Sequence, residues 1–352
     1  MFRLLIPLVG LLISLNGSAQ IITTTPALPI DNQTVTVTFD AAQGTAGLSG
    51  FTGDVYAHTG VITDKSTSTS DWKYVKTAWG TNTPETKLTR LTANTYQLTI
   101  TPDIRTYYGV PASEKILKMA FVFRSADASK EGKDTGGKDI FATVYENGLN
   151  VSFLSPSTFF SFVQANQPID INITATDNDS IGLYLDNVRL KSTVSQSLTY
   201  TLVATGTEKH LLVAKGYKGT QITYDTAYYL VPGSTTTSLQ PAGTHDGINY
   251  IDDHTVTLVL FAPFKNYVYA IGDFNDWIPD NSYLMNKDGD RYWITLSGLT
   301  PGKEYIFQYL IDGNLRIADP YTEKTSDPND KYISSTIYPD LIAYPDSKTM
   351  TR

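Results

Sequence analysis

The sequence predicts an all-β protein made of tandem immunoglobulin-like β-sandwich domains, with no catalytic barrel. Apolar and polar residues alternate with a period of two over residues 35–39, 169–175 and 256–260. This alternation places one face of a strand in a core and the other in water. Turn-forming residues interrupt the runs at short intervals, and the most helix-like segment, around residues 113–119, is brief. Short strands separated by frequent turns are typical of sandwiches.

The N-terminus has the pattern of an export signal. Arg3 precedes an apolar run over residues 4–15, and small residues follow up to Ala19. A positive region, a short apolar core and small residues predict a signal peptide over residues 1–19. The run is shorter than the roughly 20 apolar residues that span a membrane. We therefore expect a protein that is secreted or periplasmic and is cleaved after Ala19, and the lack of cysteine in an exported chain favours a bacterial source.

Three sandwiches are expected in the exported chain. The first covers residues 20–152, the second covers residues 153–231, and the third covers residues 247–337. Residues 232–246 are rich in Pro, Gly, Ser and Thr and predict a linker, and residues 338–352 are expected to be a tail leading to a further domain. The strands expected in the second unit are 169–175, 181–185, 198–203, 210–215 and 223–230.

Composition excludes several classes of protein and partner. The 352 residues include no cysteine, which excludes disulfides and thiolate-bound metals. The chain is long enough to form two or three hydrophobic cores without them. A net charge of −8, with scattered Lys and Arg, argues against a nucleic-acid partner. A neutral polysaccharide is indifferent to that charge.

The third unit carries an ordered series of motifs. Gly272 to Trp277 reads GDFNDW, Tyr292-Trp293 follows, and Asp312-Gly313 predicts a hairpin turn between residues 305–311 and 315–317. With Leu299–Gly302 and Ala318–Tyr321, their order and spacing resemble carbohydrate-binding module family 48. That immunoglobulin-like domain precedes the catalytic barrel in α-amylase-type enzymes of glycoside hydrolase family 13. The resemblance implies an α-glucan as the ligand class and a barrel-facing edge at Ala318–Tyr321.

Two tryptophans of this unit are candidate sugar contacts. An indole ring offers an apolar, electron-rich plane that matches the C–H face of a pyranose. Trp277 is therefore either a sugar platform or a residue packed against the sandwich edge or a neighbouring domain. Trp293 lies out of phase with Ile294 and Leu296. This phase places Trp293 on the face away from the core, where it would meet either sugar or an adjoining domain.

The first unit contains a second aromatic set. Segments 55–60 and 71–75 and the pair Trp79-Gly80 resemble starch-binding modules of families 25 and 26. In those modules a strand His or Tyr and two Trp residues form a shallow glucan site. The resemblance implies binding roles for Tyr56, His58, Trp72 and Trp79. The alternative is that one Trp fills the core and that His58 only satisfies a backbone group.

We predict no catalytic residue, metal or cofactor. A glycosidase needs two carboxylates about 5–10 Å apart in a cleft, and family 13 holds them in a barrel of roughly 250 residues. The alternating strand–helix pattern of such a barrel is missing, and the acidic turns at residues 177–179 and 288–290 lack calcium-loop spacing. The four histidines suggest no catalytic triad.

The two resemblances predict the starch-binding, non-catalytic N-terminal region of an α-amylase-type enzyme. Its expected partners are an α-glucan, such as starch, glycogen or maltooligosaccharides, and a catalytic barrel outside this chain. The alternative is a stand-alone surface glycan-binding protein that serves a starch-uptake system.

Overall fold

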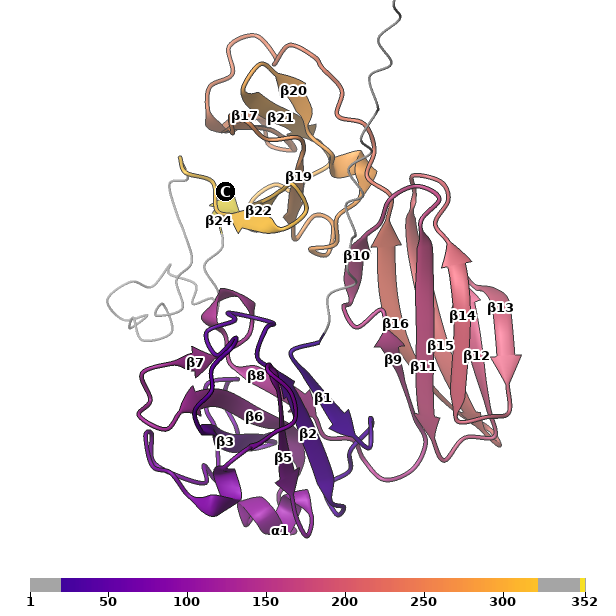
Figure 1. Ribbon diagram of the computed structural model, residues 1–352. Helices are drawn as coiled ribbons and strands as arrows, with labels where there is room; N and C mark the ends of the chain where they lie inside the picture. Colours follow the sequence, from indigo (N-terminus) through magenta and orange to yellow (C-terminus); the bar gives the residue numbers. More distant parts are fainter. Residues whose placement is uncertain (1–19, 322–348, 352) are drawn as a thin grey trace, which may run out of the picture.

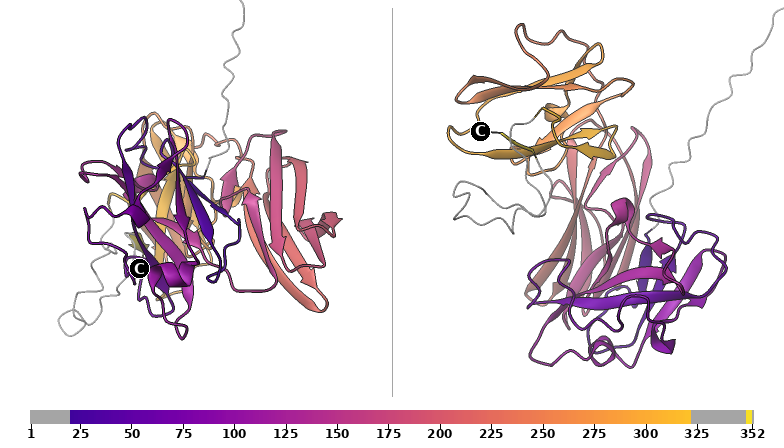
Figure 2. Two further views of the ribbon diagram at one scale, coloured as in Figure 1. Left: turned by 60° about the horizontal axis from the view of Figure 1, so that its bottom comes forward. Right: turned by 90° about the vertical axis from the view of Figure 1, so that its left-hand side faces the viewer.

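The computed structural model describes residues 20–321 and 349–351, which form three β-sandwiches visible as separate lobes in Figure 1. The left view of Figure 2 shows the second sandwich beside the other two, which overlap in that view. The predicted all-β class is confirmed. The predicted signal peptide lies outside the described residues. One α-helix, α1 (Ile104–Tyr108), occurs in the described part of the chain. No helix there is long and apolar enough to cross a membrane.

The first sandwich packs two four-stranded sheets face to face. Val37 and Phe39 from one sheet and Phe121 and Phe123 from the other are fully buried between them. One sheet has the order β1 (Ile22–Thr25), β2 (Val35–Asp40), β5 (Thr95–Ile100), β4 (Thr89–Arg90). The other contains β3 (Val55–Thr63), β6 (Ile116–Ser125), β7 (Glu131–Gly132) and β8 (Ile140–Thr143), with β7 and β8 both paired to β6.

The helix of this sandwich does not lie where the sequence looked most helical. Residues 113–119 lead into β6, whereas α1 begins after Asp103, whose carboxylate caps it by accepting from Thr106 N at 2.7 Å. Gly109 ends α1 in the left-handed conformation, with φ of 75°. Side-chain capping and a terminal glycine define this helix, because its five residues are too few to show a period.

The second sandwich begins earlier than expected. Strand β9 starts at Asn150, and Val151 belongs to the second core, so the boundary lies before Asn150 and not at residue 152. Its three-stranded sheet is β14 (Ser197–Val203), β11 (Pro168–Thr176), β9 (Asn150–Ser155). Its five-stranded sheet is β10 (Phe160–Phe162), β16 (Gln221–Leu230), β15 (Lys209–Lys218), β12 (Ser180–Leu185), β13 (Val188–Thr193).

The third sandwich contains the expected hairpin. Strands β22 (Tyr305–Ile311) and β23 (Leu315–Ile317) flank Asp312 and Gly313, whose φ angles are 49° and 77°. Gly272 is required because an added Cβ would lie 2.4 Å from the carbonyl oxygen of Ile306. The other strands among the described residues are β17 (Gly247–Asp252), β18 (Thr255–Phe261), β21 (Arg291–Leu296) and β20 (Asn286–Asp288) in one sheet, and β19 (Val268–Gly272) and β24 (Thr349–Thr351) beside β22 in the other.

The expected linker and tail are both attached to this sandwich. Ser238 N donates to Lys287 O at 3.0 Å, and Lys287 N donates to Thr236 O at 2.8 Å, so the linker lies along β20. Strand β24 pairs with β22, so residues 349–351 return to the third sandwich instead of leading away from it. Residues 322–337 of the expected third unit, and residues 338–348 and 352 of the expected tail, lie outside the described residues.

The second and third sandwiches share a small apolar core. Leu230 of β16 is buried with Tyr269, Ile271 and Leu310 of the third sandwich, and β10 lies beside this contact in Figure 1. Asn281 reinforces it, because its Nδ2 donates to Val231 O at 3.0 Å and its Oδ1 accepts from Gly233 N at 2.9 Å. The two sandwiches are therefore joined by packing as well as by the chain.

Candidate functional site

The candidate site lies on the outer face of the sheet that contains β3. Along β3, Ala57 and Val61 point into the core, so Tyr56 and His58 point outward. The chain after β3 turns back along its free edge, where Lys73 N donates to Val61 O at 2.8 Å. Gly60 permits this approach, since a Cβ there would lie 2.9 Å from Lys73 O.

This returning loop brings all four predicted residues of the first sandwich to one place. The His58 ring stacks on Trp72 with centroids 5.6 Å apart, and Trp79 meets the same ring edge-on at 5.1 Å. Trp72 in turn meets Phe141 of β8 at 6.5 Å. We call Tyr56, His58, Trp72, Trp79 and Phe141 the aromatic cluster.

The two tryptophans differ in exposure. Trp79 is 48% exposed, whereas Trp72 is half-buried and its indole N–H donates to Thr69 O at 3.1 Å. Neither belongs to the core of the first sandwich, so the interpretation that one Trp fills that core is wrong. Trp79 therefore offers the larger surface to a ligand, and Trp72 supports His58 by stacking on its ring.

Arg124 lies beneath this cluster and was not predicted as a site residue. It is fully buried on β6, directly opposite Tyr56. Its Cζ atom lies 5.6 Å from the centroid of the Tyr56 ring and 5.9 Å from that of Trp79. The sequence could have indicated its direction. Arg124 alternates with Phe121 and Phe123, which point into the core, so Arg124 and Val122 lie on the outer face of β6.

Arg124 also anchors the loop that carries Trp79. Its Nη2 donates to Thr81 O at 2.6 Å and its Nη1 donates to Asn82 Oδ1 at 2.8 Å. Burial lowers the pKa of the guanidinium, and its Nε has no hydrogen-bond partner among the described residues. A buried cation between two aromatic rings gains cation–π attraction that offsets part of its lost hydration.

His58 is held in a setting that disfavours its charged form. Partial burial lowers its pKa below the usual 6.5, the positive charge of Arg124 lowers it further, and Asp139 acts in the opposite direction. Its Nδ1 is buried without a hydrogen-bond partner in the described part of the chain, so the interpretation that this atom satisfies a backbone group is not supported. The neutral imidazole packs between Trp72 and Trp79 as a third ring.

We expect acidification to destabilise the first sandwich through His58. Because the folded-state pKa is depressed, the unfolded chain takes up the proton first, and stability falls as pH drops below about 6.5 toward the folded-state pKa. Thermal melting between about pH 7.5 and about pH 5 measures this loss. His58→Gln should reduce the pH dependence in that window, and an unchanged dependence in this variant would contradict the assignment.

The predicted tryptophans of the third sandwich lie elsewhere. Trp277 packs against the shared core between the second and third sandwiches and lines a crevice of about 310 Å³ with Phe160 and Phe162. Trp293 faces away from its own core, as expected, and its indole N–H donates to Ser238 O of the linker at 2.9 Å. Both therefore contact neighbouring segments, and neither approaches the aromatic cluster.

The edge at Ala318–Tyr321, which was expected to face a barrel, contains one residue buried in the third sandwich itself and an exposed tyrosine. Asp319 is buried and accepts from the Tyr309 hydroxyl at 2.7 Å and from Tyr321 N at 2.8 Å. Burial raises the pKa of its carboxyl group. Tyr321 is exposed beside it.

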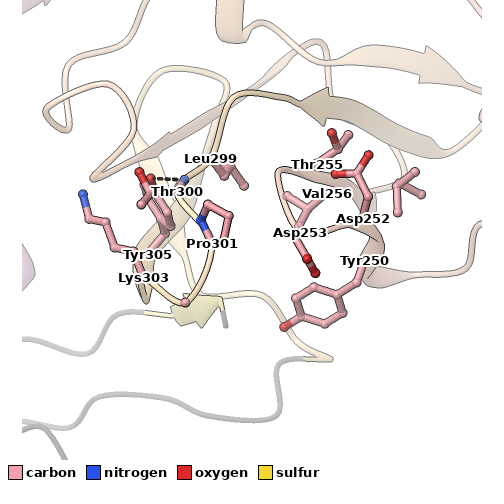
Figure 3. A pocket seen from close by; sticks show the side chains of 12 residues that line it. Tyr250, Asp252, Asp253, Thr255, Val256, Leu299, Thr300, Pro301, Lys303 and Tyr305 are labelled. Carbon is pink, nitrogen blue, oxygen red and sulfur yellow. Dashed lines mark hydrogen bonds between the residues drawn. The ribbon is translucent and has the colours of Figure 1, made fainter.

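A separate pocket of about 480 Å³ opens at one end of the third sandwich (Figure 3). Figure 3 shows Tyr250 of β17 and Asp253 of the following turn on one side of the pocket and Pro301 on the other side. None of the predicted site residues lines it. Residues 20–321 and 349–351 contain no group of three or more His, Asp or Glu side chains arranged to hold a metal ion.

Comparison with known proteins adds a family match for part of the chain. The model of a domain of unknown function (DUF8578) matches residues 22–131, which cover most of the first sandwich. No curated protein matches the sequence.

Solved structures resemble the chain only distantly. A β-glucuronidase from Parabacteroides merdae is 9% identical with a TM-score of 0.22, over 49% of this chain and 25% of that one. The fibronectin(III)-like modules of Clostridium thermocellum CbhA are 13% identical with a TM-score of 0.22, over 60% of this chain and 93% of that one. A β-glycosidase from Bacteroides vulgatus is 12% identical with a TM-score of 0.21, over 49% and 24%. The chain thus spans about a quarter of the length of these two glycosidases.

Proposed function

We propose that this chain is the exported, α-glucan-binding ancillary region of an α-amylase-like glycoside hydrolase. The observation that carries the proposal is the aromatic cluster, in which a half-exposed Trp79 stands beside His58 and Trp72 on one sheet face. Indole rings stack on the apolar face of glucose, and the neutral His58 suits a neutral sugar. The choice of α-glucan among neutral polysaccharides rests on the motif resemblances in the first and third sandwiches.

The three sandwiches then have different tasks. The first binds the glucan through Trp79, with Trp72 and His58 as a supporting wall and Arg124 as the anchor of the loop. The third sandwich acts as a spacer fixed to the second, since Trp277 and Trp293 contact neighbouring segments. A single shallow site binds weakly, so strong attachment to granular starch needs further sites on the same enzyme.

Affinity electrophoresis tests the proposal. The mature chain should migrate more slowly in a native gel containing soluble starch than in a gel without polysaccharide. Hydroxyethylcellulose, whose glucose units are β-linked, should not retard it. Equal migration with and without starch would contradict the proposed ligand.

We expect no hydrolysis of starch, maltooligosaccharides or pullulan by this chain alone. The reason is that the described residues form sandwiches and no barrel, and the aromatic cluster holds no pair of carboxylates. A reducing-sugar assay over many hours at high protein concentration measures this. Activity that copurifies with the chain and disappears on replacing one Asp or Glu would make it an enzyme.

A further inference from the structure

We propose that a bound glucan chain continues from the aromatic cluster, past Phe141, into the groove between the first and second sandwiches. This inference rests on the proposed function and extends the site to longer ligands. The groove has a volume of about 740 Å³, within the roughly 300–1,000 Å³ of small-molecule sites. It lies between β1 and β8 of the first sandwich and β9 of the second, with residues 157 and 158 at its rim.

Phe141 makes the cluster and the groove continuous. Its neighbours Ile140 and Ala142 are buried in the core, so Phe141 points to the outer face, where it meets Trp72. The same residue lines the groove. Trp79, His58, Trp72 and Phe141 thus form a series of ring contacts, with successive centroids 5.1, 5.6 and 6.5 Å apart, that leads from exposed Trp79 to the groove.

The groove offers the groups that a neutral sugar chain needs. Gln43 and Asp134 line it from the first sandwich, and Ser157 and Thr158 line it from the second. Amide, carboxylate and hydroxyl groups all exchange hydrogen bonds with sugar hydroxyls. The ring of Tyr145 adds apolar surface for stacking. The groove is therefore mixed in character, as expected of a path for a polysaccharide and unlike a purely apolar docking surface.

A length series of ligands tests the extension. Calorimetric titration of the full mature chain with maltotriose and with maltoheptaose should show about five- to tenfold tighter binding of the longer sugar, since added hydrogen bonds contribute about 1 kcal/mol each. Ser157→Trp places a bulky ring at the rim and should abolish this advantage while maltotriose binding stays unchanged. Ser192→Trp is the matched control, because Ser192 is also an exposed serine of the second sandwich but lies outside the groove.

The results distinguish the extended site in the groove from glucan binding at the aromatic cluster alone. A length advantage that Ser157→Trp removes and Ser192→Trp retains supports the extended site. Equal affinities for the two sugars, or an advantage that survives in Ser157→Trp, would overturn the extension and leave the aromatic cluster as the whole site. Absence of binding to either sugar would overturn the proposed function together with the extension.

Discussion

Replacing Trp79 by alanine is expected to weaken the binding of soluble starch by about tenfold while the melting temperature changes little. A tenfold loss corresponds to about 1.4 kcal/mol, which matches one lost ring contact with a sugar. Trp79 is 48% exposed and lies outside the core, so its removal opens no internal cavity. Calorimetry and thermal melting of the same preparation measure the two effects together.

Tyr224→Ala is the matched control for this variant. Tyr224 is an aromatic residue of the second sandwich that is 69% exposed and lies outside the aromatic cluster, so its loss should change neither quantity. Unchanged starch affinity in Trp79→Ala would show that Trp79 is not the platform. A large fall in the melting temperature of Trp79→Ala would instead assign this ring to the stability of the loop.

Replacing Arg124 by methionine is expected to lower both the stability of the first sandwich and the affinity for starch. The substitution removes the hydrogen bonds that the guanidinium donates to Thr81 O and Asn82 Oδ1, each worth about 0.5–1.5 kcal/mol, since both acceptors belong to exposed residues that water can reach. It also removes the cation that contacts the Tyr56 and Trp79 rings. The melting temperature should fall by several degrees, and the Trp79 loop should lose its fixed position.

If Arg124 positions the Trp79 loop, its replacement should also change the exposure of Trp79. Trp79 should become more accessible to acrylamide quenching of its fluorescence at a temperature where the variant is still folded. Arg124→Lys should restore part of both properties, because it keeps the charge but not the planar fork that donates to two acceptors. Arg90→Met is the control, since Arg90 lies 5.9 Å from the Tyr96 ring on the exposed surface of the same sandwich. Unchanged quenching and affinity in Arg124→Met would refute the role.

Strand periodicity predicted much of this structure. The alternation over residues 169–175 predicted β11, whose Ile171, Ile173 and Ala175 are buried, and Asp312-Gly313 marked a hairpin whose strands have the expected bounds. These features are local, since the side-chain direction in a strand and the turn type depend on neighbouring residues.

Features that depend on distant contacts were not predictable in the same way. The phase of β6 directs Arg124 outward, but only the returning loop buries it under Trp79. The motif around Trp277 allowed either a sugar contact or a domain contact, and only the fold shows that Trp277 packs on the core shared with the second sandwich, beside Phe160 and Phe162. The expected start of the second unit at residue 153 falls inside β9 (Asn150–Ser155), because the chain-breaking Pro156 follows this strand instead of preceding it.

Amide hydrogen exchange with and without maltoheptaose is the sharpest test of the glucan site on the first sandwich, because it locates the ligand on the chain. We predict slower exchange in β3 and in the loop over residues 64–83 that carries Trp72 and Trp79, and little change around Trp277 and Trp293. Protection confined to the third sandwich, or no protection at a saturating sugar concentration, would contradict a glucan site on the first sandwich.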